Sequence, residues 1–535
     1  MLLNGILSGC SSVNSKLFKD EPVTLTLYNV EANGEMVTDY DVMKKIEEIT
    51  GVKLKIIGNN EAFSKPIDLM IAKEDYPDLI YAKGDTGSLI DSRVLIKLDE
   101  YMEKYGDNLK ALYGDQLIRL KHTAEDPSIY TVGSGNSDMP LNPEGTVQIQ
   151  HAVLKELNYP RITTIKEYEN AIKEYMSKYP EINGEKTIGM SLMASDWRWL
   201  ITVGNIASAV AGIPNDGQFS VNDETGEVKY KFEIPEVKEY LKWLNHIYNE
   251  GLLDKDSFTQ TQEEYHEKMR KGLILAISDS KWDYNVTNDN LVAAGKEELT
   301  FAPLSVTVNS TVKDQSLKNY GFSGGWGIGI TKTCKNPEKA FKLLDWLASD
   351  EAQVLLNWGI EGKHYKYENG KRVFLDSVKE QMKTDSNFTY SSGINKYTNF
   401  LISRGDGEVD STGNNYTTNT LENYIENYNS AEKATLAAYG AKSWVELFPT
   451  AEELGESKHG QVWEYNIPAD SDISLIQNKA DAFTQEAITK AIIGPEEEFD
   501  IAWDSIQAEL KNLGVDKMNK DMTELTKEKI ALWNK

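Results

Sequence analysis

Hydrophobic and polar positions near the start of the chain first alternate, as in β-strands, and then switch to helical spacing. Apolar or β-branched side chains alternate with others over 23–28 and again over 52–57, which predicts two strands. Between them, residues 40–49 carry apolar side chains at helical spacing. Strand, helix and strand in this order predict a βαβ unit with a parallel sheet, which residues 78–82 extend by a third strand.

Helical patterns dominate the middle of the chain. The unbroken apolar run 273–277 predicts a buried strand, and 301–304 and 327–331 predict strands that return to the first sheet. Residues 130–148 are rich in Gly, Pro and Asn and poorly periodic, so we expect a boundary between two lobes there. Helices are predicted over 165–179, 197–210, 236–250, 262–271, 337–357, 430–439, 475–491 and 496–512.

These patterns predict an α/β protein of two lobes with a ligand cleft between them. We expect lobe 1 to comprise 21–135 and 302–350, and lobe 2 to comprise 136–301 and 351–535, the latter ending in a helical C-terminal extension. Clefts at domain interfaces are where small ligands most often bind.

Charge narrows the choice of partners. The 535 residues include 57 Lys plus Arg and 84 Asp plus Glu, a net charge of −27. This excess opposes binding to nucleic acid or to anionic lipid headgroups, so neither is an expected partner. After residue 20 no apolar run approaches the roughly 18–20 residues of a membrane span, so we expect membrane attachment only through an N-terminal lipid.

The two cysteines have dissimilar surroundings. Leu7-Ser8-Gly9-Cys10 fits a bacterial lipobox, with a hydrophobic stretch before it and a polar tether after it. We therefore expect residues 1–20 to be leader remnant and tether, and Cys10 to carry a lipid on the outer face of the cytoplasmic membrane. Nine residues are too few for a complete leader, so we expect it to begin upstream. Cys334 is expected to be an isolated thiol.

Searches for catalytic motifs are negative. The sequence has no Gly-x-Ser-x-Gly, no His-Glu-x-x-His and no phosphate-binding loop of the Gly-x-x-x-x-Gly-Lys type, and its six His residues are scattered without ligand spacing. We therefore expect neither an enzyme nor a metal site.

Aromatic side chains beside polar ones indicate a carbohydrate site. Sugars have flat C–H faces that stack on indole rings and hydroxyl rims that need planar donors and acceptors. Trp243 and Trp346 lie at helical spacing among Leu residues, so we expect both in the core. The candidate ligand-binding residues are Trp197, Arg198 and Trp199 at a helix start, Trp282, Asp283 and Tyr284 after the buried strand, Trp326 before a strand, and Asn29 and Asp85 at strand ends of lobe 1.

Several motifs in a fixed order resemble a known family. They are Tyr-Pro-Asp-Leu-Ile at 76–80, the stretch 273–351 with Gly-Gly-Trp-Gly-Ile-Gly-Ile-Thr, Trp-Gly-Ile-Glu-Gly-Lys-His-Tyr at 358–365, and Ile-Gly-Pro-Glu at 493–496. The chain resembles bacterial extracellular solute-binding proteins, which include maltose-binding protein, and within them the large lipoproteins of oligosaccharide and alginate-type importers. The resemblance implies a periplasmic-binding-protein-like fold of type II, hinge closure on a carbohydrate, and ABC permease subunits as partners. It places Trp282 where maltose-binding protein has a sugar-stacking Trp.

Two segments differ from the family's usual sequence, so the roles of those segments in relatives are not assigned to this chain. Residues 180–189 lack the acidic ladder of the calcium loop in alginate-type relatives, so structural calcium is not expected. Gln-His-Ala-Val-Leu at 150–154 replaces the usual Arg-x-Asp-Trp-Leu. We expect a monomer that binds an oligosaccharide. The alternatives are a peptide or other polar solute in the same fold, a surface glycoside hydrolase, and a structural lipoprotein of the cell wall.

Overall fold

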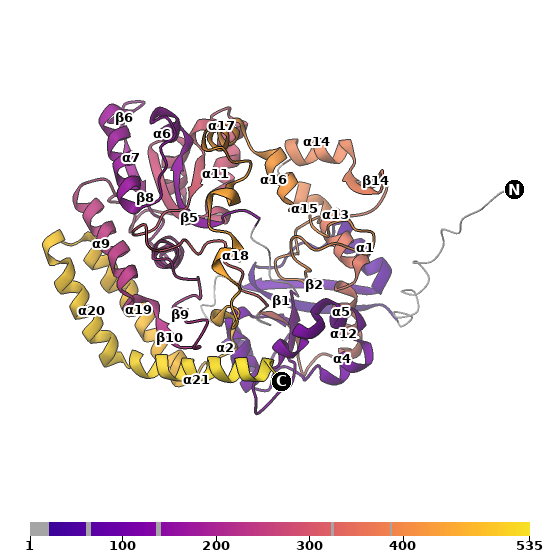
Figure 1. Cartoon of the computed structure of the whole chain (residues 1–535). Helices are drawn as coiled ribbons and strands as arrows, with labels where there is room; N and C mark the ends of the chain where they lie inside the picture. The colour runs from indigo at the N-terminus through magenta and orange to yellow at the C-terminus, as the bar shows by residue number, and fades with distance from the viewer. Residues whose placement is uncertain (1–20, 60–65, 135–140, 323–325, 386–387) are drawn as a thin grey trace.

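A computed structural model describes residues 21–59, 66–134, 141–322, 326–385 and 388–535, whose strands form two main sheets (Figure 1). Each sheet is packed with helices, and the two lobes that result lie side by side. Cys10 and its leader lie outside the described residues. Within the described residues, no helix combines the length and apolar character that crossing a membrane requires.

The first sheet contains the strands expected from the N-terminal pattern. β1 is parallel to β2 and to β3, whereas β13 is antiparallel to both β3 and β4. Between β1 and β2, α1 (Asp41–Thr50) buries its apolar side and ends at Gly51, whose φ of 63° closes the helix. The predicted βαβ unit is confirmed. In spatial order the strands are β2 (Val52–Asn59), β1 (Val23–Asn33), β3 (Leu79–Tyr81), β13 (Gly327–Ile330) and β4 (Thr131–Gly133).

The second sheet is built around the predicted buried strand. β11 is parallel to β8 and antiparallel to β5, which in turn pairs antiparallel with β12. The chain passes from the first sheet to the second between Gly133 and Gly145, within the segment whose composition indicates a boundary. In spatial order the strands are β12 (Phe301–Leu304), β5 (Gly145–Gln150), β11 (Ile274–Ser280) and β8 (Ile188–Ser191).

The structure places two predicted segments in the other lobe. Residues 302–304 are expected in lobe 1, but β12 pairs with β5 at the edge of the second sheet, where Pro303 is tolerated. Residues 351–402 are expected in lobe 2, but the apolar side chains of α13 (Asp350–Trp358) and of 394–402 pack into the same core as β1 and β2. Both corrections arise because apolar faces pack against the nearest sheet, which sequence order does not reveal.

Most predicted helices are present with small shifts at their ends. The helix expected over 337–357 is two helices, α12 (Pro337–Leu347) and α13, because Ser349 has extended backbone angles and caps α13. The helix expected over 197–210 is a π-helical turn, Leu200–Asn205, followed by α8 (Ile206–Val210). The others are α7 (Ile165–Lys178), α9 (Pro235–Asn249), α10 (Gln262–Arg270), α17 (Ser430–Tyr439), α19 (Asp472–Ile493) and α20 (Phe499–Leu513).

The remaining α-helices and the hairpins complete the two lobes. Among the described residues the remaining helices are α2 (Pro66–Lys73), α3 (Thr86–Asp91), α4 (Asp99–Tyr105), α5 (Asp107–Tyr113), α6 (His151–Glu156), α11 (Lys281–Ala293), α14 (Asp376–Thr384), α15 (Phe388–Ser392), α16 (Leu421–Asn427), α18 (Ala451–Leu454) and α21 (Val515–Trp533). The hairpins are β6 (Glu181–Ile182) with β7 (Glu185–Lys186), β9 (Phe219–Val221) with β10 (Val228–Tyr230), and β14 (Tyr365–Glu368) with β15 (Lys371–Phe374).

The last helix, α21, contacts both lobes. In the second lobe, the Asn519 side chain accepts a hydrogen bond of 2.8 Å from the backbone N–H of Tyr230. Near its other end, Lys529 donates to the carbonyl of His122, which follows the helices of the first lobe. Figure 1 shows this helix running along the lower side of the molecule toward the first lobe. The C-terminal extension is therefore a connection between the lobes.

Candidate functional site

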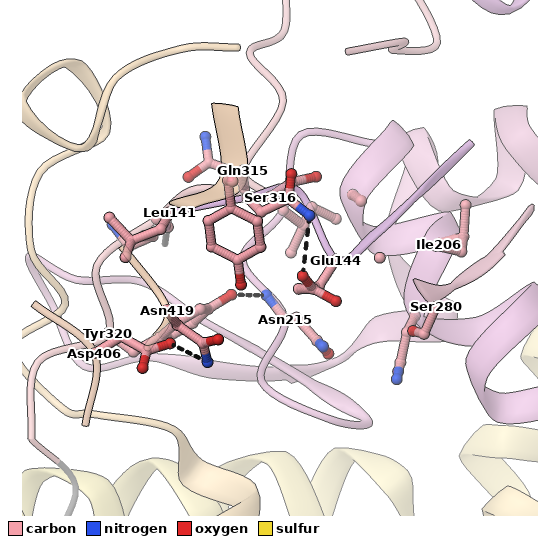
Figure 2. Close-up of a pocket in the computed structure, with 17 residues that line it drawn as sticks. Leu141, Glu144, Ile206, Asn215, Ser280, Gln315, Ser316, Tyr320, Asp406 and Asn419 are labelled. Atoms are coloured by element: carbon pink, nitrogen blue, oxygen red, sulfur yellow. Dashed lines mark hydrogen bonds between the residues drawn. The ribbon is translucent and has the colours of Figure 1, made fainter. Parts of the chain in front are cut away.

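A polar cavity of about 600 Å³ lies near the strand ends of the second lobe (Figure 2). Segments far apart in the sequence line it: the crossing between the lobes at 141–145, the helical segment 205–213, Ser280 at the end of β11, the loop 315–320, and residues 406–424. The cavity therefore lies where the crossing segment, the second lobe and the chain that returns from the first lobe meet.

Side-chain amides and hydroxyls supply most of the polar lining. Figure 2 shows Asn215 beside Tyr320, whose hydroxyl accepts a hydrogen bond from the Asn215 backbone N–H, and Asn419 beside Asp406, to which it donates at 3.1 Å. An amide both donates and accepts, which matches a ligand hydroxyl that does the same. The remaining amides and hydroxyls of the lining are Asn142, Asn205, Gln315, Ser280, Ser316 and Tyr424.

One wall of the cavity follows the π-helical turn Leu200–Asn205. Asn205 ends this turn, and its side-chain oxygen accepts a hydrogen bond of 3.1 Å from Nζ of Lys231, which is fully buried. Burial lowers the pKa of Lys231 to about 7. A π-helical turn inside a helical segment often occurs at functional sites, because it redirects side chains that a regular helix would place elsewhere.

A group of buried charged side chains lies behind the two loops that carry Asn215 and Tyr320. Burial raises the pKa of Asp216 to about 7, since its carboxylate is removed from water. Although burial opposes it, hydrogen bonds from His459 and Lys318 hold the pKa of Asp223 well below its usual range. Lys318, which also lines the cavity, places Nζ 2.8 Å from Asp223 Oδ2. These pairings fix the loop that carries Tyr320 against the segment that carries His459.

Two exposed indoles lie together beside the same strand ends. Trp197 follows β8 and Trp282 follows β11, and the carboxyl ends of these parallel strands meet at one edge of the sheet. Trp197 is 58% exposed and Trp282 is 53% exposed. Their ring planes are parallel within 4°, with centroids 5.9 Å apart. Large apolar groups that are exposed in a pair indicate a surface kept for binding.

A charge network holds this indole pair. The Arg198 side chain donates to Asp283 at 3.0 Å and to Asp196 at 2.6 Å, and its guanidinium carbon lies 4.8 Å from the centroid of the Trp197 ring. Gln262 donates to the same Asp283 oxygen at 2.6 Å. Asp283 is buried, so its carboxylate positions Arg198 under Trp197 and is not presented to a ligand.

Other predicted site residues belong to the protein interior. Trp199 and Tyr284 are each 3% exposed; Trp199 packs on Phe232 and Tyr284 packs on Phe301. Their rings offer no face to a ligand, which corrects their assignment to the site. Both follow an exposed indole by two residues, so they point to another side of their segments.

The remaining three predicted residues lie in the first lobe or next to its sheet. Trp326 is half-buried, packs edge-on against Trp463 at 4.5 Å, and has Nζ of Lys83 4.6 Å from its ring centroid. Asn29 is buried, and its side chain accepts a hydrogen bond from the backbone N–H of Glu31. Asp85 is exposed after β3. None of these three lines the cavity of Figure 2.

Sequence reasoning missed the side chains that line the cavity. Glu144 and Asn142 lie in the Gly-, Pro- and Asn-rich segment 130–148, which the composition indicates only as a boundary. A crossing segment at a lobe interface is itself a place for ligand contacts, and this signal points to both residues. Asp406 and Asn419 carry no comparable signal, because their segment is loop-rich and only the fold brings it to the cavity.

The structure also locates the segment that replaces the calcium loop. Residues 181–186 form the hairpin of β6 and β7, with Asn183 and Gly184 at φ values of 52° and 82°. This is the backbone of a tight two-residue turn. Across the described part of the chain, no three His, Cys, Asp or Glu side chains gather in a way that could hold a metal ion.

Two α/β lobes joined by crossing segments, with a polar cavity and exposed indoles at the strand ends, define the class of two-lobed solute-binding proteins. The sequence pattern of the family described as bacterial extracellular solute-binding protein matches residues 41–357. Because this match covers more than half of the chain, the chain belongs to that family. The resemblance inferred from the motifs and the two-lobed fold are both confirmed.

Similar proteins of known sequence cover part of the chain. Lipoprotein LipO of Bacillus subtilis is 22% identical over 346 residues, which are 62% of this chain and 66% of that protein. The fructooligosaccharide ABC transporter substrate-binding protein FusA of Streptococcus pneumoniae is 23% identical over 338 residues, 60% of each chain. The chain thus spans less than two thirds of the length of these relatives.

Solved structures resemble the fold over nearly its whole length. FusA of Streptococcus pneumoniae in complex with kestose superposes with a TM-score of 0.66 at 18% identity, covering 96% of this chain and 100% of that one. The alginate-binding protein AlgQ2 without calcium ion gives a TM-score of 0.65 at 18% identity, with 95% and 99% covered. A solute-binding protein of Bifidobacterium longum subsp. infantis gives 0.69 at 16% identity, with 95% and 98% covered.

Proposed function

We propose that this protein binds an oligosaccharide outside the cell by closing its two lobes and delivers it to an ABC importer without altering it. The observation that carries the proposal is the parallel pair of exposed indoles, Trp197 and Trp282, of which Trp282 follows the cavity-lining Ser280 by two residues. The names of FusA and AlgQ2, which describe fructooligosaccharide and alginate binding, support a carbohydrate as the ligand class.

The chemistry of the site favours a sugar over other solutes. The flat C–H face of a pyranose or furanose ring stacks on an indole, while its hydroxyls need groups that both donate and accept. Trp282 offers the face, and the amides of Asn142, Asn205 and Asn215 offer the donors and acceptors. A peptide would need a cation for its C-terminal carboxylate, but Lys318 in the cavity lining is paired with Asp223.

Lobe closure is the motion that this architecture supports. The chain passes from one sheet to the other between β4 and β5 and again between β12 and β13, and bending at such connections allows hinge closure of two lobes. Closure removes water from the cavity and brings both lobes against the ligand, and permease subunits can then distinguish the closed form from the open one.

The anchor is part of the same proposal. Cys10 in its lipobox would carry a lipid that keeps the protein at the outer face of the cytoplasmic membrane, and the relative LipO is named as a lipoprotein. Mass spectrometry of the mature protein, isolated from bacterial membranes, tests this. The expected result is a diacylglycerol-modified Cys10 that is absent in Cys10→Ser, and an unmodified mature N-terminus would contradict it.

The test of binding is isothermal titration with a panel of oligosaccharides of two to six units. We expect at least one to bind and to raise the melting temperature, because a ligand at 100 times its Kd adds about 2.7 kcal/mol to the free energy of unfolding. Trp282→Ala should weaken binding at least tenfold, whereas Trp282→Phe should keep part of the stacking. Ile501→Ala, at an exposed position of α20, serves as the control. Binding by peptides alone, or full binding by Trp282→Ala, would contradict the proposal.

A further inference from the structure

The charged side chains that line the cavity are mostly negative. Glu144 and Asp406 contribute two carboxylates, and Lys318 is the only Lys or Arg in the described part of the lining. The Lys318 side chain is 4% exposed and its ammonium is paired with Asp223, so its charge is already balanced. A ligand in the cavity therefore meets two carboxylates, whereas the one ammonium among the described lining residues is already paired.

Cations on segments that adjoin the lining in sequence, or that follow the same strand ends, have partners of their own. Arg198 is held by Asp196 and Asp283, and Arg404 donates to the backbone carbonyl of Ala348 at 3.1 Å. The ammonium of Lys281 lies 5.7 Å from the ring centroid of Tyr424, which puts this one cation at the rim of the cavity.

We propose that the ligand is an uncharged oligosaccharide, and that Glu144 and Asp406 exclude sugars that carry carboxylate or sulfate groups. This inference rests on the proposed function and specifies its substrate class. Like charges a few ångströms apart repel, and the repulsion grows when the lobes close and water leaves the cavity. Neutral sugar hydroxyls, by contrast, can donate hydrogen bonds to the same two carboxylates. The two side chains therefore favour a neutral sugar and disfavour an acidic one.

The direct test compares one sugar in three forms. A neutral oligosaccharide that binds is titrated alongside the same molecule with its primary hydroxyls oxidised to carboxylates, and alongside the methyl ester of the oxidised form. We expect the oxidised form to bind at least tenfold more weakly and the ester to recover most of the loss, because the ester keeps the bulk and removes the charge. Raising the salt concentration to about 0.5 M should reduce the difference in Kd between the neutral and the oxidised sugar, since salt screens charge repulsion.

Variants assign the effect to the two carboxylates. In the parent protein we expect the Kd of the oxidised sugar to exceed that of the neutral sugar. The double variant Glu144→Gln, Asp406→Asn should lower this ratio of Kd values at least threefold. Asp406→Asn also removes acceptors of the hydrogen bonds from Thr417 and Asn419, which could disturb the fold. The single variant Glu144→Gln avoids this change and should lower the same ratio of Kd values. Glu497→Gln with Asp504→Asn removes the same total charge from exposed positions and should leave the ratio unchanged.

Three results would overturn the inference. The oxidised sugar could bind as tightly as the neutral one, the double variant could leave the ratio unchanged, or Lys281→Gln could weaken only the oxidised sugar, which would make Lys281 a receptor for anionic ligands. Failure of every oligosaccharide to bind in any form would instead overturn the proposed function itself, so the two failures are distinguishable.

Discussion

At the scale of the residue, the indole pair depends on side chains that do not face the ligand. Asp283 is 2% exposed and Arg198 is 15% exposed at the side chain, and their ion pair holds the guanidinium close to the Trp197 ring. A buried carboxylate that loses its cation is left without compensation, which costs more than the pair contributes.

We therefore expect Arg198→Met to lower the free energy of unfolding by about 2 kcal/mol, less than a fully buried pair would lose because Gln262 still donates to Asp283. The same variant should weaken oligosaccharide binding by releasing Trp197. Urea denaturation and titration measure the two effects. Adding Asp283→Leu should restore much of the stability but not the binding, and a stable single variant with normal binding would refute this role.

Asp216 gives a pH dependence whose sign follows from its burial. Its pKa of about 7 in the folded protein exceeds the roughly 3.9 of an unfolded Asp, so between these values the folded state keeps a proton that the unfolded chain releases. Stability from this group is therefore complete below about pH 4 and is lost as the pH rises through 7.

The Asn side chain of Asp216→Asn does not titrate, so the variant does not lose this stability as the pH rises. Between pH 4 and pH 8 its free energy of unfolding should therefore rise relative to that of the parent protein. At roughly 1.4 kcal/mol per pKa unit, the relative rise is up to about 4 kcal/mol. Chemical denaturation of both proteins across this range measures the difference. A difference that stays constant, or that falls with pH, would show that Asp216 is ionised throughout. Asp504→Asn, at an exposed position, controls for the change in net charge.

Sequence patterns predict single residues well where periodicity constrains them. Trp243 and Trp346, expected in the core from helical spacing, are 7% and 2% exposed. Trp282 is exposed after β11, and its role in ligand binding stays a prediction. Helical spacing also separates Trp199 from Trp197, because two residues along a helical turn move a side chain by about 200° around the axis, and Trp199 is accordingly buried while Trp197 is exposed.

At the scale of the element, strand and helix types are predictable and their breaks are less so. The apolar pattern runs through 337–357 without interruption, but the chain turns at Ser349, where the side-chain oxygen accepts a hydrogen bond from the N–H of Ala352 at 3.3 Å. A polar cap inside an apolar stretch is a weak sequence signal, although Asp350 and Glu351 after it fit the start of a new helix.

We expect Ser349→Ala to destabilise the protein by about 1 kcal/mol, because the first turn of α13 loses its cap. Ser349→Asp should retain most of the stability, since a carboxylate accepts the same bond and suits a helix N-terminus. Thermal and urea unfolding compare the three proteins. If Ser349→Ala and Ser349→Asp are equally stable, Ser349 does not stabilise the protein by capping α13.

At the scale of the whole molecule, the two-lobed α/β fold follows from the order of the strands and helices, but the membership of segments in each lobe does not. β12 joins the second sheet and residues 394–402 join the first core, because each apolar face packs on the nearest sheet in space. The cavity was equally inaccessible from sequence, since its lining comes from five separate segments. The central claim is that an oligosaccharide binds in this cavity and on the adjoining indoles.

A crystal structure of the protein with a bound oligosaccharide tests that claim most directly. We expect one sugar ring stacked on Trp282, sugar hydroxyls within hydrogen-bonding distance of the amides that line the cavity, and lobes closed around the ligand. An oligosaccharide bound on another face of the molecule, with Trp197 and Trp282 still open to solvent, would contradict it.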